Sequence, residues 1–116
     1  MHELYIAESI LNTVSEALPA GVHPESVLEV HVQVGQLDAV VPETLLFLFD
    51  AIKASKGMPR ARLDIERIDI LCRCEDCARE FGLDLPVFLC PSCGSGNLDV
   101  LQGRGISIQR INAEDT

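Results

Sequence analysis

CRCEDC at residues 72–77 and CPSCG at residues 90–94 decide how this chain of 116 residues is organised. Each stretch holds a Cys-x-x-Cys pair, and a loop of twelve residues separates the two pairs. Such a loop lets two turns face each other around one metal ion. The four candidate ligands are Cys74, Cys77, Cys90 and Cys93. Four thiolates leave no open position for water or substrate, so the spacing predicts a structural zinc site.

The remaining residues of this region refine that prediction. Cys72 alternates inward with its strand, which favours a small buried side chain over an exchange with Cys74 as ligand. Gly94 and Gly96 follow the second pair, where tight turns with positive φ aim N–H groups at the sulfurs. A redox dithiol is the competing interpretation of a Cys-x-x-Cys, but such motifs occur singly.

Outward from the cysteines, the apolar spacing predicts helices and strands. Intervals of three and four residues predict a helix over residues 4–18 and a second, very apolar one over 42–57. Alternation predicts strands over 27–35, 61–72 and 105–111. The strand over 61–72 changes phase, so we expect a bulge near Glu66 or Arg67.

These elements predict an α+β fold. We expect a small, mainly antiparallel sheet with two helices, and a four-cysteine zinc-ribbon module inserted before the last strand. The expected domains are residues 1–71 with 99–116, and the zinc-binding insertion 72–98. Residues 73–97 hold few large apolar side chains, so metal rather than hydrophobic burial should hold the insertion together.

Composition excludes several classes of function. Hydrophobic residues make up 47% of the chain, enough for an ordinary core, but the formal charge of −9 repels nucleic acid and anionic membrane surfaces. No apolar run approaches the roughly 20 residues of a membrane span. The first residues lack a signal-peptide pattern, and the cysteines have metal spacing, so we expect a cytoplasmic protein without nucleic-acid or membrane partners.

The chain starts with Met1-His2-Glu3, a second set of possible ligands. The Met1 amine, the next backbone nitrogen and the His2 imidazole can close adjacent chelate rings, which suits Ni(II) or Cu(II). Glu3 would add a carboxylate or orient the imidazole. The alternative is a frayed end ahead of a helix.

Together these motifs resemble the HypA/HybF family of nickel metallochaperones for [NiFe]-hydrogenase maturation. The resemblance rests on Met1-His2-Glu3, on VGQLDAVVPE at residues 34–43, on the two cysteine pairs and on Gly103-Arg104. It covers essentially the whole chain.

The resemblance implies a carrier rather than an enzyme, with Ni(II) as transient cargo and Zn(II) as a structural ion. It implies His2 as nickel ligand with Glu3 beside it, and Cys74, Cys77, Cys90 and Cys93 as zinc ligands. The implied partners are a HypB-type GTPase and the [NiFe]-hydrogenase large subunit, with urease maturation proteins in some organisms. The rival hypothesis is a zinc-ribbon protein-interaction module without a nickel role.

Overall fold

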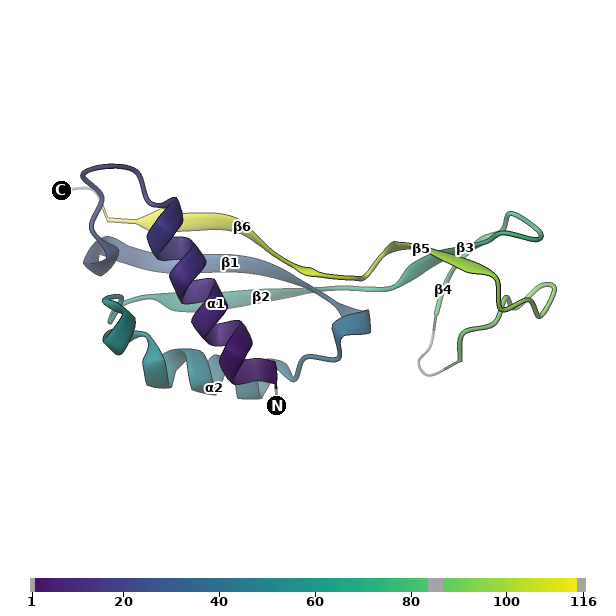
Figure 1. The fold of residues 1–116 in the computed structure, drawn as a ribbon, viewed down its shortest axis with the longest axis horizontal. Helices are drawn as coiled ribbons and strands as arrows, with labels where there is room; N and C mark the ends of the chain where they lie inside the picture. Colours follow the sequence, from purple (N-terminus) through teal and green to yellow (C-terminus); the bar gives the residue numbers. More distant parts are fainter. Residues whose placement is uncertain (1, 84–86, 115–116) are drawn as a thin grey trace. The chain divides into compact units, whose positions relative to one another are not determined.

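The computed structural model describes residues 2–83 and 87–114, which form two helices and two three-stranded sheets (Figure 1). The helices are α1 (His2–Ala17) and α2 (Pro42–Ile52), and the strands are β1 (Val27–Gly35), β2 (Arg62–Ile68), β3 (Leu71–Cys74), β4 (Glu80–Gly82), β5 (Leu98–Gln102) and β6 (Ile106–Ala113). The chain divides into two compact units. Unit 1 comprises Met1–Gln33, Val40–Glu66 and Ser107–Thr116, and unit 2 comprises Val34–Ala39 and Arg67–Ile106.

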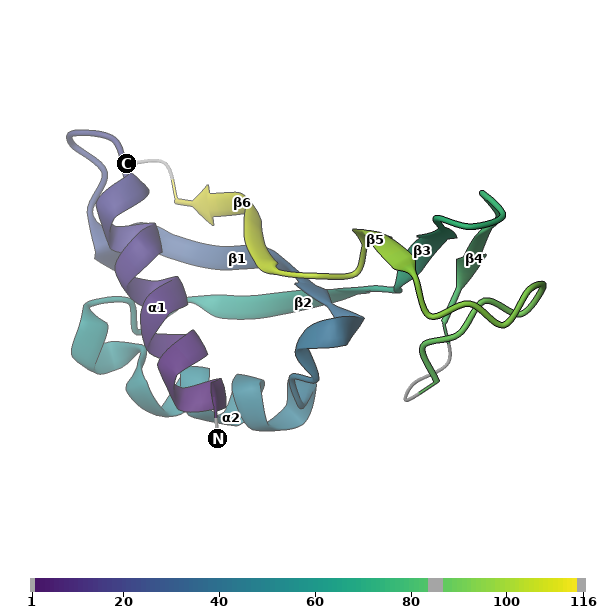
Figure 2. The same ribbon diagram turned by 45° about the vertical axis from the view of Figure 1, so that its right-hand side comes forward.

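Unit 1 is a sheet of order β2-β1-β6 with both helices beside it (Figure 2). The ribbon shows β2 running parallel to β1 after the α2 crossover, and β6 running antiparallel to β1. In β1 the side chains of Val30 and Val32 are buried, whereas those of Glu29 and His31 are only partly buried. The helices therefore cover one face of the sheet and leave the polar face open.

The helices have the apolar faces that the sequence predicted. Ala7, Leu11 and Val14 of α1 are fully buried, and so are Leu45 and Phe49 of α2. The predicted second helix is shorter than expected, because the α-helix ends at Ile52 and a 3-10 turn (Ala54–Lys56) follows it. Among the residues that the structure describes, no helix is long and apolar enough to cross a membrane.

The predicted strand over 61–72 is wrong as a single element. The structure divides it into β2, which belongs to the sheet of β1, and β3, which belongs to the sheet β4-β3-β5. The phase change that suggested a bulge near Glu66 or Arg67 therefore lies close to a change of sheet. A bulge does occur further along, between Leu71 and Cys72, where β3 pairs with β5.

Unit 2 has a small hydrophobic core, which the sequence analysis missed. Its buried members are Ile70, Cys72, Cys74, Phe81, Leu83 and Cys90, with Leu37, Leu98 and Val100 packed against them. Several of these residues lie outside 73–97, in flanking strands, which explains why the composition of the insertion alone suggested no core. Cys72 serves here as a small apolar group.

Residues 34–39, from the end of β1 to the turn that follows it, belong to unit 2 and are hydrogen-bonded to the segments that lead into β3 and out of β5. The N–H groups of Gly35 and Leu37 donate to the carbonyls of Gly105 and Gly103, both over 2.9 Å. In return, the Asp38 carboxylate accepts the Gly105 N–H over 2.7 Å. Gln36 Oε1 accepts the Ile70 N–H over 3.1 Å. We call residues 34–39 the strap.

At Gly35 the strap lies so close to the backbone of Gly103 that no side chain would fit. A Cβ added to Gly35 would lie 2.2 Å from the Gly103 carbonyl oxygen, and one added to Gly103 would lie 2.6 Å from Ile70 Cα. Neither neighbour is a flexible side-chain end, so the backbone would have to move. The close approach therefore requires glycine at both positions.

We predict that Gly35→Ala lowers the free energy of unfolding by about 2 kcal/mol or more, because the added methyl group overpacks against backbone. Gly82→Ala in β4 is the matched control, since its Cβ would be 3.6 Å from the Ile70 carbonyl oxygen, an ordinary contact. Urea unfolding of the two zinc-loaded variants measures the difference. Equal midpoints would show that the strap yields easily.

Candidate metal centre

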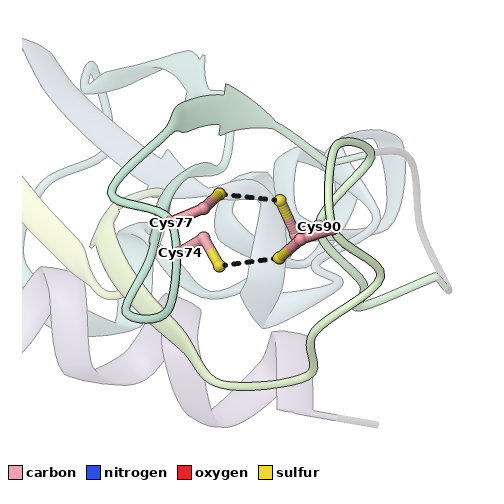
Figure 3. Close-up of side chains that lie close together, drawn as sticks. Cys74, Cys77 and Cys90 are labelled. Carbon is pink, nitrogen blue, oxygen red and sulfur yellow. Dashed lines mark hydrogen bonds between the residues drawn. The ribbon is translucent and has the colours of Figure 1, made fainter.

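The four cysteines of the two pairs meet in one cluster (Figure 3). Their sulfur atoms all lie within 4.8 Å of one another. Cys74 Sγ is 3.5 Å from Cys93 Sγ, and Cys77 Sγ is 3.6 Å from Cys90 Sγ, so each contact joins one pair to the other. The sequence prediction that these two turns face each other is confirmed.

Both Cys-x-x-Cys turns have the same backbone design. The N–H of Ala78 donates to the Cys74 carbonyl over 2.8 Å, and the N–H of Gly94 donates to the Cys90 carbonyl over 2.9 Å. Ala78 and Gly94 each follow the second cysteine of a pair and have positive φ, 64° and 74°. The expected positive φ is thus present at Gly94 but not at Gly96.

This backbone aims N–H groups at the sulfurs and changes how readily they ionise. Burial opposes the Cys90 thiolate, but the N–H groups of Cys93 and Ser92 lower the pKa of Cys90 to about 6. The Ser95 N–H favours the Cys93 thiolate, yet the hydrogen bond with the Cys74 thiol and burial outweigh it and raise the pKa of Cys93 to about 12. Four adjacent sulfurs cannot all be thiolates unless a cation neutralises them.

A zinc ion fits this cluster. Tetrahedral Zn–S bonds of about 2.3 Å place the sulfurs of one site about 3.8 Å apart. The two shortest contacts, 3.5 and 3.6 Å, and the outer limit of 4.8 Å bracket that spacing. Among the described residues no other group of three or more His, Cys, Asp or Glu side chains meets the same geometric test.

Polar side chains that the sequence analysis missed brace the two turns. Asp76, inside the first pair, accepts the Ser95 hydroxyl and, over 3.4 Å, the Asn97 amide. Arg79 donates to the hydroxyl of Ser92, inside the second pair. Each of these hydrogen bonds joins a residue in or next to one Cys-x-x-Cys turn to a residue in or next to the other. The sequence could not show them, because they form only when the two turns face each other.

Cys72 lies outside the sulfur cluster, as its inward strand position predicted. It is fully buried and pairs in register with Phe81 of β4 and Val100 of β5. Burial, followed by the Asp99 charge, raises the pKa of its thiol. These surroundings favour the apolar role over the alternative that Cys72 replaces Cys74 as a ligand.

The N-terminal residues lie in unit 1, on the first turn of α1. His2 is exposed, whereas Glu3 is 6% exposed and its carboxylate accepts the N–H of Val41 over 3.0 Å. The chain's amino group, followed by the N–H groups of Val41 and Glu3 itself, lowers the pKa of Glu3 to about 2. Met1 lies outside the described residues.

The Glu3 contact holds the first turn of α1 against the residue that precedes α2. The two residues are 38 positions apart, so the sequence alone offered no sign of their pairing. Asp38 lies in unit 2, where it accepts the Gly105 N–H and takes no part in this contact.

Comparisons with known proteins all find HypA proteins, and the matches cover nearly the whole chain. The family model described as hydrogenase/urease nickel incorporation, metallochaperone, hypA matches residues 1–113. The hydrogenase maturation factor HypA of Desulfosudis oleivorans is 36% identical over 99% of this chain and 100% of that protein. Its namesake from Roseiflexus sp. is 38% identical over 99% of this chain and 94% of that protein.

The solved structures show the same fold. The solution structure of the Ni metallochaperone HypA from Helicobacter pylori matches with a TM-score of 0.68 at 23% identity, over 97% of each chain. This likeness confirms the α+β fold with two helices, small sheets and a cysteine module inserted before the last strand.

We predict that Cys72→Ala leaves the cysteine cluster able to hold a metal, because Cys72 packs against apolar neighbours outside it. Co(II) titration followed by thiolate-to-cobalt charge-transfer absorption should give the wild-type spectrum for Cys72→Ala and a weakened, altered one for Cys74→Ala. Loss of the wild-type spectrum in Cys72→Ala alone would make Cys72 the ligand.

We predict opposite effects at the two matching turn positions. Ala78→Gly should raise the stability of the zinc-loaded protein by about 1 kcal/mol, because it removes the cost of a left-handed alanine. Gly94→Ala should lower it by a similar amount. Thermal unfolding measures both, and a shift of the same sign in the two variants would contradict the shared turn geometry.

Proposed function

We propose a place for each metal in this chain, which belongs to the HypA family of nickel-incorporation metallochaperones. The protein is a nickel metallochaperone of hydrogenase maturation rather than an enzyme. Its nickel is cargo, and a structural zinc ion accompanies it. The single observation that carries the assignment of zinc is the cluster of four sulfurs within 4.8 Å.

We assign zinc to Cys74, Cys77, Cys90 and Cys93. Four thiolates complete a tetrahedral coordination sphere, so the ion has no position for a further ligand. Zinc binding of about 10 to 16 kcal/mol in model peptides is ample to stabilise a unit whose apolar core is small. The zinc ion would then hold unit 2 together and leave nickel to a separate site.

We assign nickel to the start of α1, with the His2 imidazole and the Met1 amine as ligands. The first N–H groups of a helix have no acceptor inside the helix, so the backbone nitrogen of His2 can bind nickel without breaking the helical ladder. Imidazole, amine and amide nitrogens form the square-planar set that Ni(II) prefers. Exposure of His2 lets a partner reach the ion.

Glu3 would position the nickel site rather than bind the nickel ion. Its buried carboxylate holds the Val41 N–H, which fixes the first turn of α1 next to His2. The Val41 N–H favours the charged carboxylate, so the anchor stays in place in the neutral range. Direct coordination of nickel by Glu3 is the second possible role, and it would have to compete with Val41.

The assignment of domains follows from these sites. Nickel binding would belong to unit 1, and zinc binding to unit 2. The expected boundaries, residues 1–71 with 99–116 and 72–98, stay a prediction for the functional division. They differ from the compact units mainly in the strap and in residues 67–71 and 99–106.

The partners of a hydrogenase maturation factor belong to the hydrogenase maturation machinery. We propose a HypB-type GTPase and the [NiFe]-hydrogenase large subunit as the specific ones, with urease maturation proteins where urease is made. The proposed compartment is the cytoplasm, where the acceptor would be assembled.

We predict that zinc-loaded, untagged protein binds one Ni(II) per chain and that His2→Ala abolishes this binding, because the imidazole closes the chelate. Calorimetry and the visible absorption of square-planar Ni(II) provide the measurements. His23→Ala is the matched control, since His23 is also exposed but lies after α1, 21 positions further along the chain. Unchanged binding in His2→Ala would move nickel elsewhere, and no binding by either would favour the zinc-ribbon interaction module.

A further inference from the structure

The positive charge of this chain is confined to its second part. No lysine or arginine occurs before Lys53, so α1, α2 and the strap carry none. The two helices do carry acidic side chains, among them Glu8, Glu43 and Asp50. The two helices therefore carry acidic side chains without lysine or arginine, and Lys53, the residue after α2, is paired with Asp50 over 3.2 Å.

The exposed face of α2 combines these acids with large apolar side chains. Glu43, Leu46, Phe47 and Asp50 follow one another at helical spacings of three, one and three residues, which places them on one face. Phe47 is 72% exposed and Leu46 is 37% exposed. This face points away from the buried Leu45 and Phe49, so the core does not use it.

The first turns of α1 repeat the pattern. Tyr5 is 74% exposed and Leu4 is 43% exposed, and Glu8 follows one turn later. The hydrogen bond from Val41, itself 47% exposed, to Glu3 ties this part of α1 to the start of α2. Both views show the first turns of α1 beside α2 (Figures 1 and 2).

We define the helical surface as the exposed apolar side chains of these two elements together with the acids on their faces. Its members are Leu4, Tyr5, Val41, Leu46, Phe47, Glu8, Glu43 and Asp50. Aromatic anchors in an apolar centre with a charged rim are typical of a protein-binding surface. Isolated exposed apolar residues need no such explanation, but a set on two adjoining helices does.

We propose that the helical surface binds a basic amphipathic segment of a protein partner. Apolar side chains of the segment would cover Tyr5 and Phe47, and its lysines and arginines would meet Glu8 and Glu43. Asp50 lies on the same face but is paired with Lys53 over 3.2 Å, so it contributes less to this recognition. An anionic membrane and nucleic acid do not fit, because the acids of this surface repel both and its neighbouring lysine, Lys53, is already paired with Asp50. A protein segment offers the apolar area and the positive charge together.

The position of this surface gives it a use in nickel transfer. His2 lies on the same first turn as Leu4 and Tyr5, so a segment bound there brings its protein next to the exposed imidazole. This part of the inference rests on the proposed nickel site. Binding of the segment itself does not depend on nickel.

The test uses two synthetic 18-residue helical peptides with the same leucine positions, one with lysine and one with glutamate at all others. The full-length, zinc-loaded protein should bind the lysine peptide, and Phe47→Ser should weaken this binding at least about tenfold, as truncation of an aromatic anchor does. Fluorescence anisotropy of the labelled peptide gives the affinity. Affinity should fall as salt rises, because the rim is charged.

Phe88→Ser is the matched control, because Phe88 is an exposed aromatic residue of unit 2 (43% exposed). It should bind the lysine peptide like wild type, and circular dichroism should show both variants folded. The proposal is overturned if the lysine peptide does not bind, if Phe47→Ser binds it equally well, or if the glutamate peptide binds as tightly.

Nickel titration of Phe47→Ser separates this proposal from the previous one. Wild-type nickel binding together with weakened peptide binding supports the helical surface independently of the cargo site. If wild type itself fails to bind nickel through His2, the proposed function fails, whereas the peptide experiment still decides the surface.

Discussion

The repulsion among four adjacent sulfurs is the constraint on which unit 2 depends. Two turns of the same design bring the sulfurs within 4.8 Å, and their N–H groups favour ionisation at Cys90 while crowding opposes it at Cys93. A divalent cation converts this conflict into four bonds. The small core around Cys72 and the braces from Asp76 and Arg79 support the same arrangement, but the Arg79 guanidinium donates to the Ser92 hydroxyl rather than to a sulfur.

The strap gives unit 2 a second set of restraints. It also gives a structural role to the first part of the VGQLDAVVPE stretch at residues 34–43, for which the sequence alone suggested none. Gly35 permits a backbone contact that no other residue could make, and Gln36 and Asp38 each accept an N–H from one of the two neighbouring segments. Leu37 packs against the cysteine core. Residues 35–38 therefore all contribute to packing or hydrogen bonding in unit 2, although the chain enters this stretch from β1 and leaves it toward α2.

Patterns that act locally could be predicted from the sequence, and contacts between distant segments could not. Helical spacing located α1, alternation located β1, and the Cys-x-x-Cys spacing located the metal centre with its four cysteines. The division of 61–72 between two sheets was missed, because alternation does not report which sheet a strand joins. The pairing of Glu3 with Val41 was also missed, since it depends on the crossing of two helices rather than on either sequence.

The contacts of the strap and those of the cysteine cluster can form at different times while the chain is being synthesised. The sulfurs of Cys74 and Cys93 are 19 positions apart, so their loop can close soon after both have left the ribosome. Asp38 must wait for Gly105, 67 positions later, and β1 must wait for β6 at the far end of the chain. Contacts of such long range form slowly. The cysteine loop can thus close early and capture its metal, whereas β6 can complete the sheet of unit 1 only after the rest of the chain has been made.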